Sequence, residues 1–244
     1  MVSQRNSRLA TLAASVAGAG GGIALAGPLF AHFEAIAPLQ GFGAFVLGSL
    51  LAVVGGVLGA FGLRATRSGL GGRDRAWFAV VVGVLALGGV LAGALPGRGL
   101  PRINDITTDP VDPPEFVYAK RDPATRDRDY SYPAGFAEQQ RAAYPDLAPL
   151  ALALPPAQAY EKAKSAAESL GWHITLADPA RGVIEARDTS KLFRFVDDVA
   201  IRVRPGANGG SVVDIRSKSR DGQGDLGVNT KRIRAFTSKV TGKA

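Results

Sequence analysis

The stretch RATRSGLGGRDR, residues 64–75, decides how this chain is organised, because its four arginines stand between two long apolar stretches. Apolar residues without an internal charge run over 41–63 before it and over 76–95 after it, and a third such stretch covers 9–30. A helix needs about 20 apolar residues to cross the hydrocarbon core of a bilayer. The sequence therefore predicts three transmembrane helices within a membrane anchor of residues 1–98.

The distribution of arginines predicts the orientation of these helices. Arg5 and Arg8 precede the first apolar stretch, whereas the loop around Glu34 contains no Lys or Arg. Basic loops stay on the cytoplasmic side of a membrane. We therefore expect a bacterial inner-membrane protein with a cytoplasmic N-terminus and a periplasmic C-terminal part. Arg98 and Arg102 oppose this orientation weakly.

A second interpretation treats the first apolar stretch as a signal peptide. Ala24-Leu25-Ala26 has the small-x-small form of a cleavage site, although the apolar stretch continues to Phe30. Either interpretation places the C-terminal part outside the cytoplasm.

The predicted helices contain no ionisable residue, which argues against an ion channel or a proton-coupled transporter. Small residues four apart allow close helix packing and could support a homo-oligomer through these glycine-rich helices. In a chain with 31 glycines such spacings also arise by chance. The pairs are Gly18/Gly22, Gly55/Gly59 and Gly89/Gly93.

Composition excludes several classes of function. The pI is about 10.0, but residues beyond 100 carry 22 basic and 19 acidic side chains, so the basicity is mainly that of the membrane anchor. Nucleic acid is therefore not an expected partner. The chain has no cysteine and two histidines, so it offers no disulfide and no ordinary zinc site. We expect no metal and no cofactor.

Residues 99–154 form a segment rich in proline and aspartate, which favours extended and turn conformations. It is either a solvated tether or an arm that lies across the folded domain. Its aromatic residues favour the arm, and 136–143 could form two helical turns. The candidate anchors are Phe116, Tyr118, Tyr130 and Tyr132.

The sequence of residues 155–244 predicts a small α+β domain. A helix over 156–170 has proline at its first position and Gly171 after its end. A second helix over 225–240 would have Asp225 as its N-cap. Four strands are predicted between the helices, over 172–177, 182–187, 195–204 and 211–220. The order α-β-β-β-β-α implies a four-stranded antiparallel sheet with both helices on its apolar face.

The last two strands alternate so cleanly that they predict their own register. If Val203 pairs with Val213, then Ile201 lies opposite Ile215, and Asp197 lies opposite Ser219 at the margin of the apolar face. On the other face, Arg202 would meet Asp214 and Asp198 would meet Lys218, each such pair adding about 0.2–1 kcal/mol.

The best candidate for a binding site is the end of the last strand and the helix that follows. Hydroxyl groups, guanidinium groups and free N–H groups at a helix start can hold an anion such as phosphate, carboxylate or a lipid head group. A solvated charged strand with a capped helix would have the same sequence. The candidate ligand-binding residues are Asp197, Arg216, Ser217, Ser219, Arg220, Asp225, Asn229 and Arg232.

Two other motifs carry little weight. Gly222-x-Gly224-x-x-Gly227 lacks the second βα unit of a dinucleotide site, and Asp225 would occupy the position of the pyrophosphate. Asp197 and Asp198 are neighbours on a strand and face opposite sides, so they cannot share a proton. We assign no catalytic residue.

Five motifs lie between residues 104 and 233: Asn104-Asp105-Ile106-Thr107-Thr108-Asp109-Pro110, Pro113-Pro114-x-Phe116, Asp197-Asp198-x-x-Ile201-Arg202, Arg216-Ser217-x-Ser219-Arg220 and Asp225-Leu226-Gly227-x-Asn229-x-x-Arg232-Ile233. Together they resemble the bacterial domain-of-unknown-function family 1499 over about residues 103–240. The resemblance implies that the segment around Asp105–Phe116 belongs to the domain, and it implies no activity or ligand.

Three functions follow as hypotheses. The first is a non-enzymatic envelope module that binds an anionic small molecule, a lipid head group or an envelope partner. The second is a hydrolase with Asp197 as its base, which requires a closed pocket around that carboxylate. The third is a structural protein whose charged strands serve folding alone.

Overall fold

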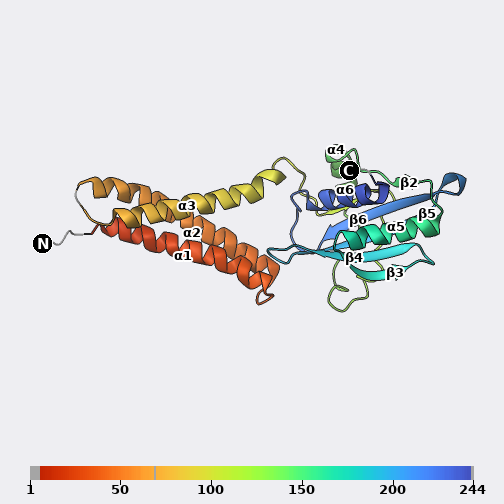
Figure 1. Ribbon diagram of the computed structural model, residues 1–244, viewed down its shortest axis with the longest axis horizontal. Coiled ribbons are helices and arrows are strands. Elements are labelled where there is room, and N and C mark those ends of the chain that lie inside the picture. Colours follow the sequence, from red (N-terminus) through yellow and green to blue (C-terminus); the bar gives the residue numbers. More distant parts are fainter. Residues whose placement is uncertain (1–5, 69, 243–244) are drawn as a thin grey trace. The chain divides into compact units, whose positions relative to one another are not determined.

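The computed structural model describes residues 6–68 and 70–242, which form two compact units. The membrane unit comprises Met1–Pro96 together with Ser190–Arg194. The domain unit comprises Gly97–Thr189 together with Phe195–Ala244. Figure 1 shows the three long helices of the membrane unit, and the sheet and helices of the domain unit.

Three helices in the membrane unit are long and apolar enough to cross a membrane. They are α1 (Arg8–His32), α2 (Pro38–Ala65) and α3 (Arg73–Ala94), and the short 3-10 turns Thr66–Ser68 and Leu95–Gly97 follow α2 and α3. Each contains one of the predicted apolar stretches, so three span-length helices are confirmed.

A seam of small residues joins α1 to α2. Gly41, Gly48 and Gly55 recur every seven residues along α2 and are buried. A Cβ atom added to Gly48 would lie 2.3 Å from the backbone nitrogen of Ala24, so only glycine allows this approach. The facing residues of α1 are spaced alternately three and four apart and are all buried: Ala10, Ala13, Ala17, Gly20, Ala24, Gly27 and Ala31.

The predicted glycine pairs serve this packing only in part. Gly55 contacts the backbone of Ala17, and Gly59 contacts α3. Gly22 and Gly93 have no atom within 4 Å of an added Cβ. The glycines of α2 therefore hold the chain's own helices together, and homo-oligomerisation stays a prediction.

The sheet of the domain unit has six strands, and every pair in it is antiparallel. Its order is β1-β6-β5-β4-β3, and β2 pairs with the same edge of β6 as β1 does, beyond the end of β1. The strands are β1 (Asp105–Thr107), β2 (Leu150–Leu152), β3 (His173–Asp178), β4 (Val183–Thr189), β5 (Val196–Pro205) and β6 (Ser211–Ser219).

The prediction of four strands was wrong, and so was the order α-β-β-β-β-α. β1 and β2 have three residues each and lie in the segment rich in proline and aspartate, so they carry no alternation long enough to recognise. They cover the edge of β6, whose backbone groups would otherwise lack partners. The actual order is β1-α4-β2-α5-β3-β4-β5-β6-α6.

The predicted register of the last hairpin is confirmed. Val203 pairs with Val213, and Asp197 pairs with Ser219. Alternation with one buried face fixes this register, because a slip of one residue would exchange the apolar and charged faces.

Two helices, α5 (Pro156–Ser169) and α6 (Val228–Thr241), cover the apolar face of the sheet (Figure 1). Ile201 and Ile215 are fully buried beneath them. The ring of Trp172 stacks on that of Phe236, with 5.7 Å between the ring centres. A short helix, α4 (Phe136–Ala143), precedes β2 and lies against β1.

The second face of the sheet is covered by residues 108–135, which we call the arm. Phe116 and Tyr130 of the arm are buried and form a small second core with Ala200 of β5. Tyr118 is 37% exposed. The sheet is therefore a middle layer, with helices on one face and the arm on the other.

Substituting alanine for single glycines of α2 tests the seam. Gly48→Ala should lower stability by about 1–3 kcal/mol, because its Cβ would overlap the α1 backbone. Gly43→Ala, on the same helix but with no atom within 4 Å, should leave stability equal or slightly higher. Thermal unfolding in detergent micelles distinguishes the two, and equal melting temperatures would contradict the seam.

Candidate functional site

Five of the predicted site residues meet on the helix-covered face of the sheet. Asp197 of β5 and Ser217 and Ser219 of β6 lie on that face, and Asn229 and Arg232 reach it from the first turns of α6. This grouping follows from strand alternation combined with the start of α6 after β6. We call these five residues the inner cluster.

The guanidinium group of Arg232 is fully engaged within the protein. Its Nε donates to Asp188 Oδ2 at 2.8 Å, and its Nη2 donates to Asp197 Oδ2 at 2.6 Å. Its Nη1 donates to Ser217 Oγ at 3.0 Å and to Asn229 Oδ1 at 2.7 Å. Two carboxylates therefore neutralise one buried cation, which leaves no net positive charge for an anion.

The remaining polar groups of the inner cluster also bond to one another. Ser217 Oγ donates to Asn229 Oδ1 at 2.7 Å. Asn229 Nδ2 donates to Ser219 Oγ at 3.0 Å and to the carbonyl oxygen of Asn104 at 3.2 Å. A network satisfied in this way orders a core and has little capacity left for a ligand.

Asp225 occupies the start of α6. The N-cap is Gly227, with a φ of 81°, so the prediction that Asp225 is the N-cap itself was wrong by two positions. The carboxylate of Asp225 still accepts from the backbone N–H groups of Gly227 at 3.0 Å and Asn229 at 2.6 Å. Burial raises the pKa of this carboxyl group. Its side chain thus takes the N–H groups that an anion would use.

Arg216 and Arg220, the other predicted site residues, lie on the opposite face with Lys218. Arg216 forms a bidentate pair with Asp105 of β1, at 2.9 and 2.7 Å. Its guanidinium carbon lies 4.9 Å from the ring centre of Phe116 and 5.4 Å from that of Tyr132. The arm therefore encloses Arg216, which is only 3% exposed.

Arg220 and Lys218 are paired with internal carboxylates as well. Arg220 forms a bidentate pair with Asp198, at 2.8 and 2.6 Å, and Tyr130 Oη donates to the same carboxylate at 2.8 Å. Lys218 donates to Asp105 at 2.9 Å. The predicted ion pair between Asp198 and Lys218 was wrong, because each has a nearer partner although their Cα atoms are in register.

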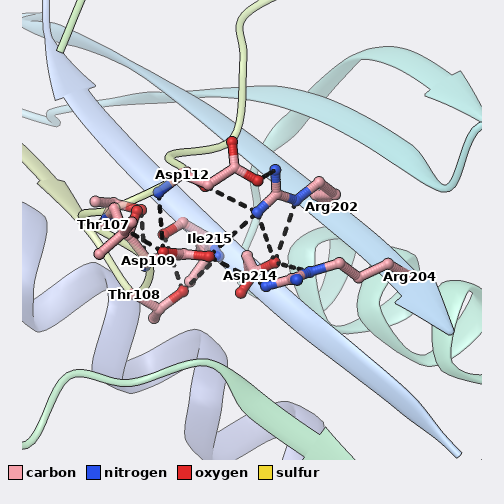
Figure 2. Close-up of polar contacts among 9 residues, drawn as sticks. Thr107, Thr108, Asp109, Asp112, Arg202, Arg204, Asp214 and Ile215 are labelled. Atoms are coloured by element: carbon pink, nitrogen blue, oxygen red, sulfur yellow. Dashed lines mark hydrogen bonds and ion pairs between the residues drawn. The ribbon is translucent and has the colours of Figure 1, made fainter. Parts of the chain in front are cut away.

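Figure 2 shows the third group of charges under the arm. Asp214 of β6, fully buried, accepts from Arg202 and Arg204 of β5. Asp109 of the arm binds both of these arginines, and Asp112 of the arm binds Arg202. The expected pair of Arg202 with Asp214 is thus present, but it lies beneath the arm and not on a solvated surface.

Glu185 of β4 was not identified from the sequence, and it fixes the middle of the arm. Its carboxylate accepts from three consecutive backbone N–H groups, those of Val117, Tyr118 and Ala119. Burial raises the pKa of this carboxyl group. An acidic residue within a short strand signals nothing by itself, because its partners lie more than 60 residues away.

These contacts do not support catalysis by Asp197. Its carboxylate is ion-paired with Arg232 and 7% exposed, whereas a general base needs access to its substrate. His173, at the start of β3, is exposed. Within the described part of the chain, no group of three His, Cys, Asp or Glu residues is placed to hold a metal ion.

Removing the Glu185 carboxylate should release the arm. Glu185→Leu leaves three backbone N–H groups without acceptors, at about 1–3 kcal/mol for each one that water does not reach. Urea unfolding of the full chain in detergent, followed by Trp172 fluorescence in a Trp77→Phe background, measures the loss. Glu115→Leu, at an exposed position of the same arm, is the control. Equal stability of the two variants would contradict this role.

Tyr130 and Tyr132 should deprotonate at a higher pH than tyrosine ordinarily does. Burial, with the nearby Asp198 for Tyr130 and Asp105 for Tyr132, raises the pKa of each from 10.0 to about 12. In the unfolded chain both tyrosines deprotonate near pH 10. Their contribution to the free energy of unfolding is therefore complete below pH 10. It should fall between pH 10 and 12, by about 1–2 kcal/mol for each tyrosine, because only the unfolded chain loses the protons there.

Absorbance at the tyrosinate band measures this titration in the folded chain. Tyr130→Phe with Tyr132→Phe should remove the last part of the curve. If the double variant instead lost only the part near pH 10, the two rings would be solvated.

The comparisons with known proteins give a family for the domain. No curated protein matches the chain. Residues 105–240, from the first residue of β1 to the last turn of α6, match the family described as "Protein of unknown function (DUF1499)". The match includes the arm and all three groups of paired charges. The chain therefore belongs to the DUF1499 family.

Proposed function

We propose that this chain is a membrane-anchored, non-enzymatic module of the bacterial envelope, whose domain lies on the periplasmic side of the inner membrane and binds an anionic ligand there. The observation that carries the location is the distribution of arginines. Four of them lie within residues 64–75, from the last turn of α2 to the first turn of α3, whereas residues 33–37 between α1 and α2 contain none. Arginine-rich loops are retained in the cytoplasm.

The pairing of charges argues against catalysis by Asp197, and it also argues against anion binding at the paired arginines. Arg216, Arg220 and Arg232 each bind a carboxylate of the same chain, so their removal would affect folding first. An anionic ligand is better served by basic side chains that are exposed. In the domain unit, Arg102, which precedes β1, is one such exposed side chain.

The saturated inner cluster also favours a second candidate, a purely structural envelope domain. On that account Ser219→Ala and Arg220→Ala variants lose thermal stability and no other property. Ligand binding by the full chain separates the two candidates.

Reporter fusions test the proposed location. Alkaline phosphatase fused after Ala244 should be active, because the enzyme folds only outside the cytoplasm, and green fluorescent protein at the same position should be dark. A matched pair of fusions after Leu70, between α2 and α3, should give the reverse. Fluorescence from the Ala244 fusion would overturn the orientation.

A further inference from the structure

The domain has a cavity between α6 and the chain that precedes β2. Its volume is about 350 Å³, which lies at the lower end of the range of small-molecule sites, roughly 300–1,000 Å³. It is lined by residues 146–148, by Thr108 and by the last two turns of α6, all of which belong to the domain unit. We call this cavity the α6 pocket.

An ion pair supplies two of the side chains that line the α6 pocket. Arg234 Nε and Nη2 donate to the two carboxylate oxygens of Asp146, both at 2.8 Å, which leaves the hydrogens of Arg234 Nη1 for another acceptor. The guanidinium carbon of Arg234 also lies 5.9 Å from the ring centre of Tyr144, which is buried. The carboxylate and the ring hold the guanidinium group in place, so a ligand would bind a group that is already ordered.

This ion pair differs from the other charge pairs of the domain in its exposure. The side chain of Arg234 is 49% exposed and that of Asp146 is 52% exposed. Exposed ion pairs contribute only about 0–1 kcal/mol to stability. The pairs of the inner cluster and those beneath the arm are required for the fold, whereas this pair is accessible and contributes little to folding.

Hydroxyl groups of α6 supply neutral donors and acceptors to the same cavity. Thr241 Oγ1 donates to the carbonyl oxygen of Thr237 at 2.8 Å, which leaves its lone pairs for another donor. Among the residues that the structure describes, Thr237 Oγ1 forms no hydrogen bond, so it can both donate and accept. Leu147 and Ala148 add a small apolar surface to the lining.

The combination of these groups indicates the chemistry of a ligand. Because Asp146 neutralises Arg234, the α6 pocket has no net charge with which to attract an anion. It offers donors and acceptors close together, so a well-matched ligand carries both. Neighbouring hydroxyl groups of a sugar ring do this, and the C–H groups of the same ring can pack against an apolar surface.

We propose that the α6 pocket binds a neutral saccharide. Asp146 accepts from one sugar hydroxyl group, Arg234 donates to the next, and the threonine hydroxyl groups of α6 bond to others. Leu147 and Ala148 contact the ring. This site is additional to the anion-binding surface of the proposed function, and it does not depend on the side of the membrane on which the domain lies.

Binding to immobilised saccharides tests the proposal with the full chain. The chain is reconstituted in nanodiscs, because detergents with sugar head groups would compete, and is applied to an array of neutral and acidic oligosaccharides. The neutral ones are built from glucose, galactose, mannose and N-acetylglucosamine, and the acidic ones contain uronic acids. The chain should bind at least one neutral saccharide, and the same saccharide in solution should displace it. Binding to no neutral saccharide would overturn the proposal, and so would binding to acidic ones alone.

Variants show whether the α6 pocket is the place of binding. Thr237→Phe adds a ring that fills the cavity and should abolish binding. Ala235→Phe adds the same ring at an exposed position of α6 outside the lining, so it should bind as the unmodified chain does. Asp146→Asn keeps the shape but removes charge-assisted hydrogen bonds, so affinity should fall about tenfold or more.

Melting temperatures show which variants are folded. Equal binding by folded Thr237→Phe and Ala235→Phe would contradict the assignment of the pocket. If Thr237→Phe does not fold, Asp146→Asn decides instead, because its exposed pair contributes little to stability. Undiminished affinity in that variant would then overturn the proposal.

Discussion

The domain depends on neutralising, inside the fold, a row of cations that its sheet carries on one face. Arg202, Arg204, Arg216, Lys218 and Arg220 lie on this face of β5 and β6, and water would normally solvate them. The arm covers them instead, and β1 and the arm supply Asp105, Asp109 and Asp112 as partners. Breaking one partner of a buried pair costs about 3–5 kcal/mol, so the arm and the sheet each require the other.

This constraint explains which features could be predicted from the sequence. Alternation in β5 and β6 predicted their register, and the proline at Pro156 marked the start of α5, because both signals are local. Three-residue strands such as β1 have no local signal. The same alternation placed Asp197, Ser217 and Ser219 on one face. It could not indicate that Asp188 and Asp197 would both bind Arg232, since that depends on how α6 lies on the sheet.

The internal pairing also limits where this domain can act. Its most polar residues already bind one another, so a ligand would have to displace a buried ion pair to reach them. A partner of this domain would therefore bind to its exterior. A rigid sheet fixed by ion pairs on one face and an apolar core on the other suits a module that presents a surface.

Hydrogen–deuterium exchange of the arm in the folded full-length chain tests most directly whether the charged face is an interior. The backbone N–H groups of Val117, Tyr118 and Ala119 lie in a segment without regular secondary structure, yet they bind the buried Glu185 carboxylate. We expect them to exchange far more slowly than a flexible segment does. Exchange at the rate of an unstructured peptide would show that the arm is detached and that the cations beneath it are solvated.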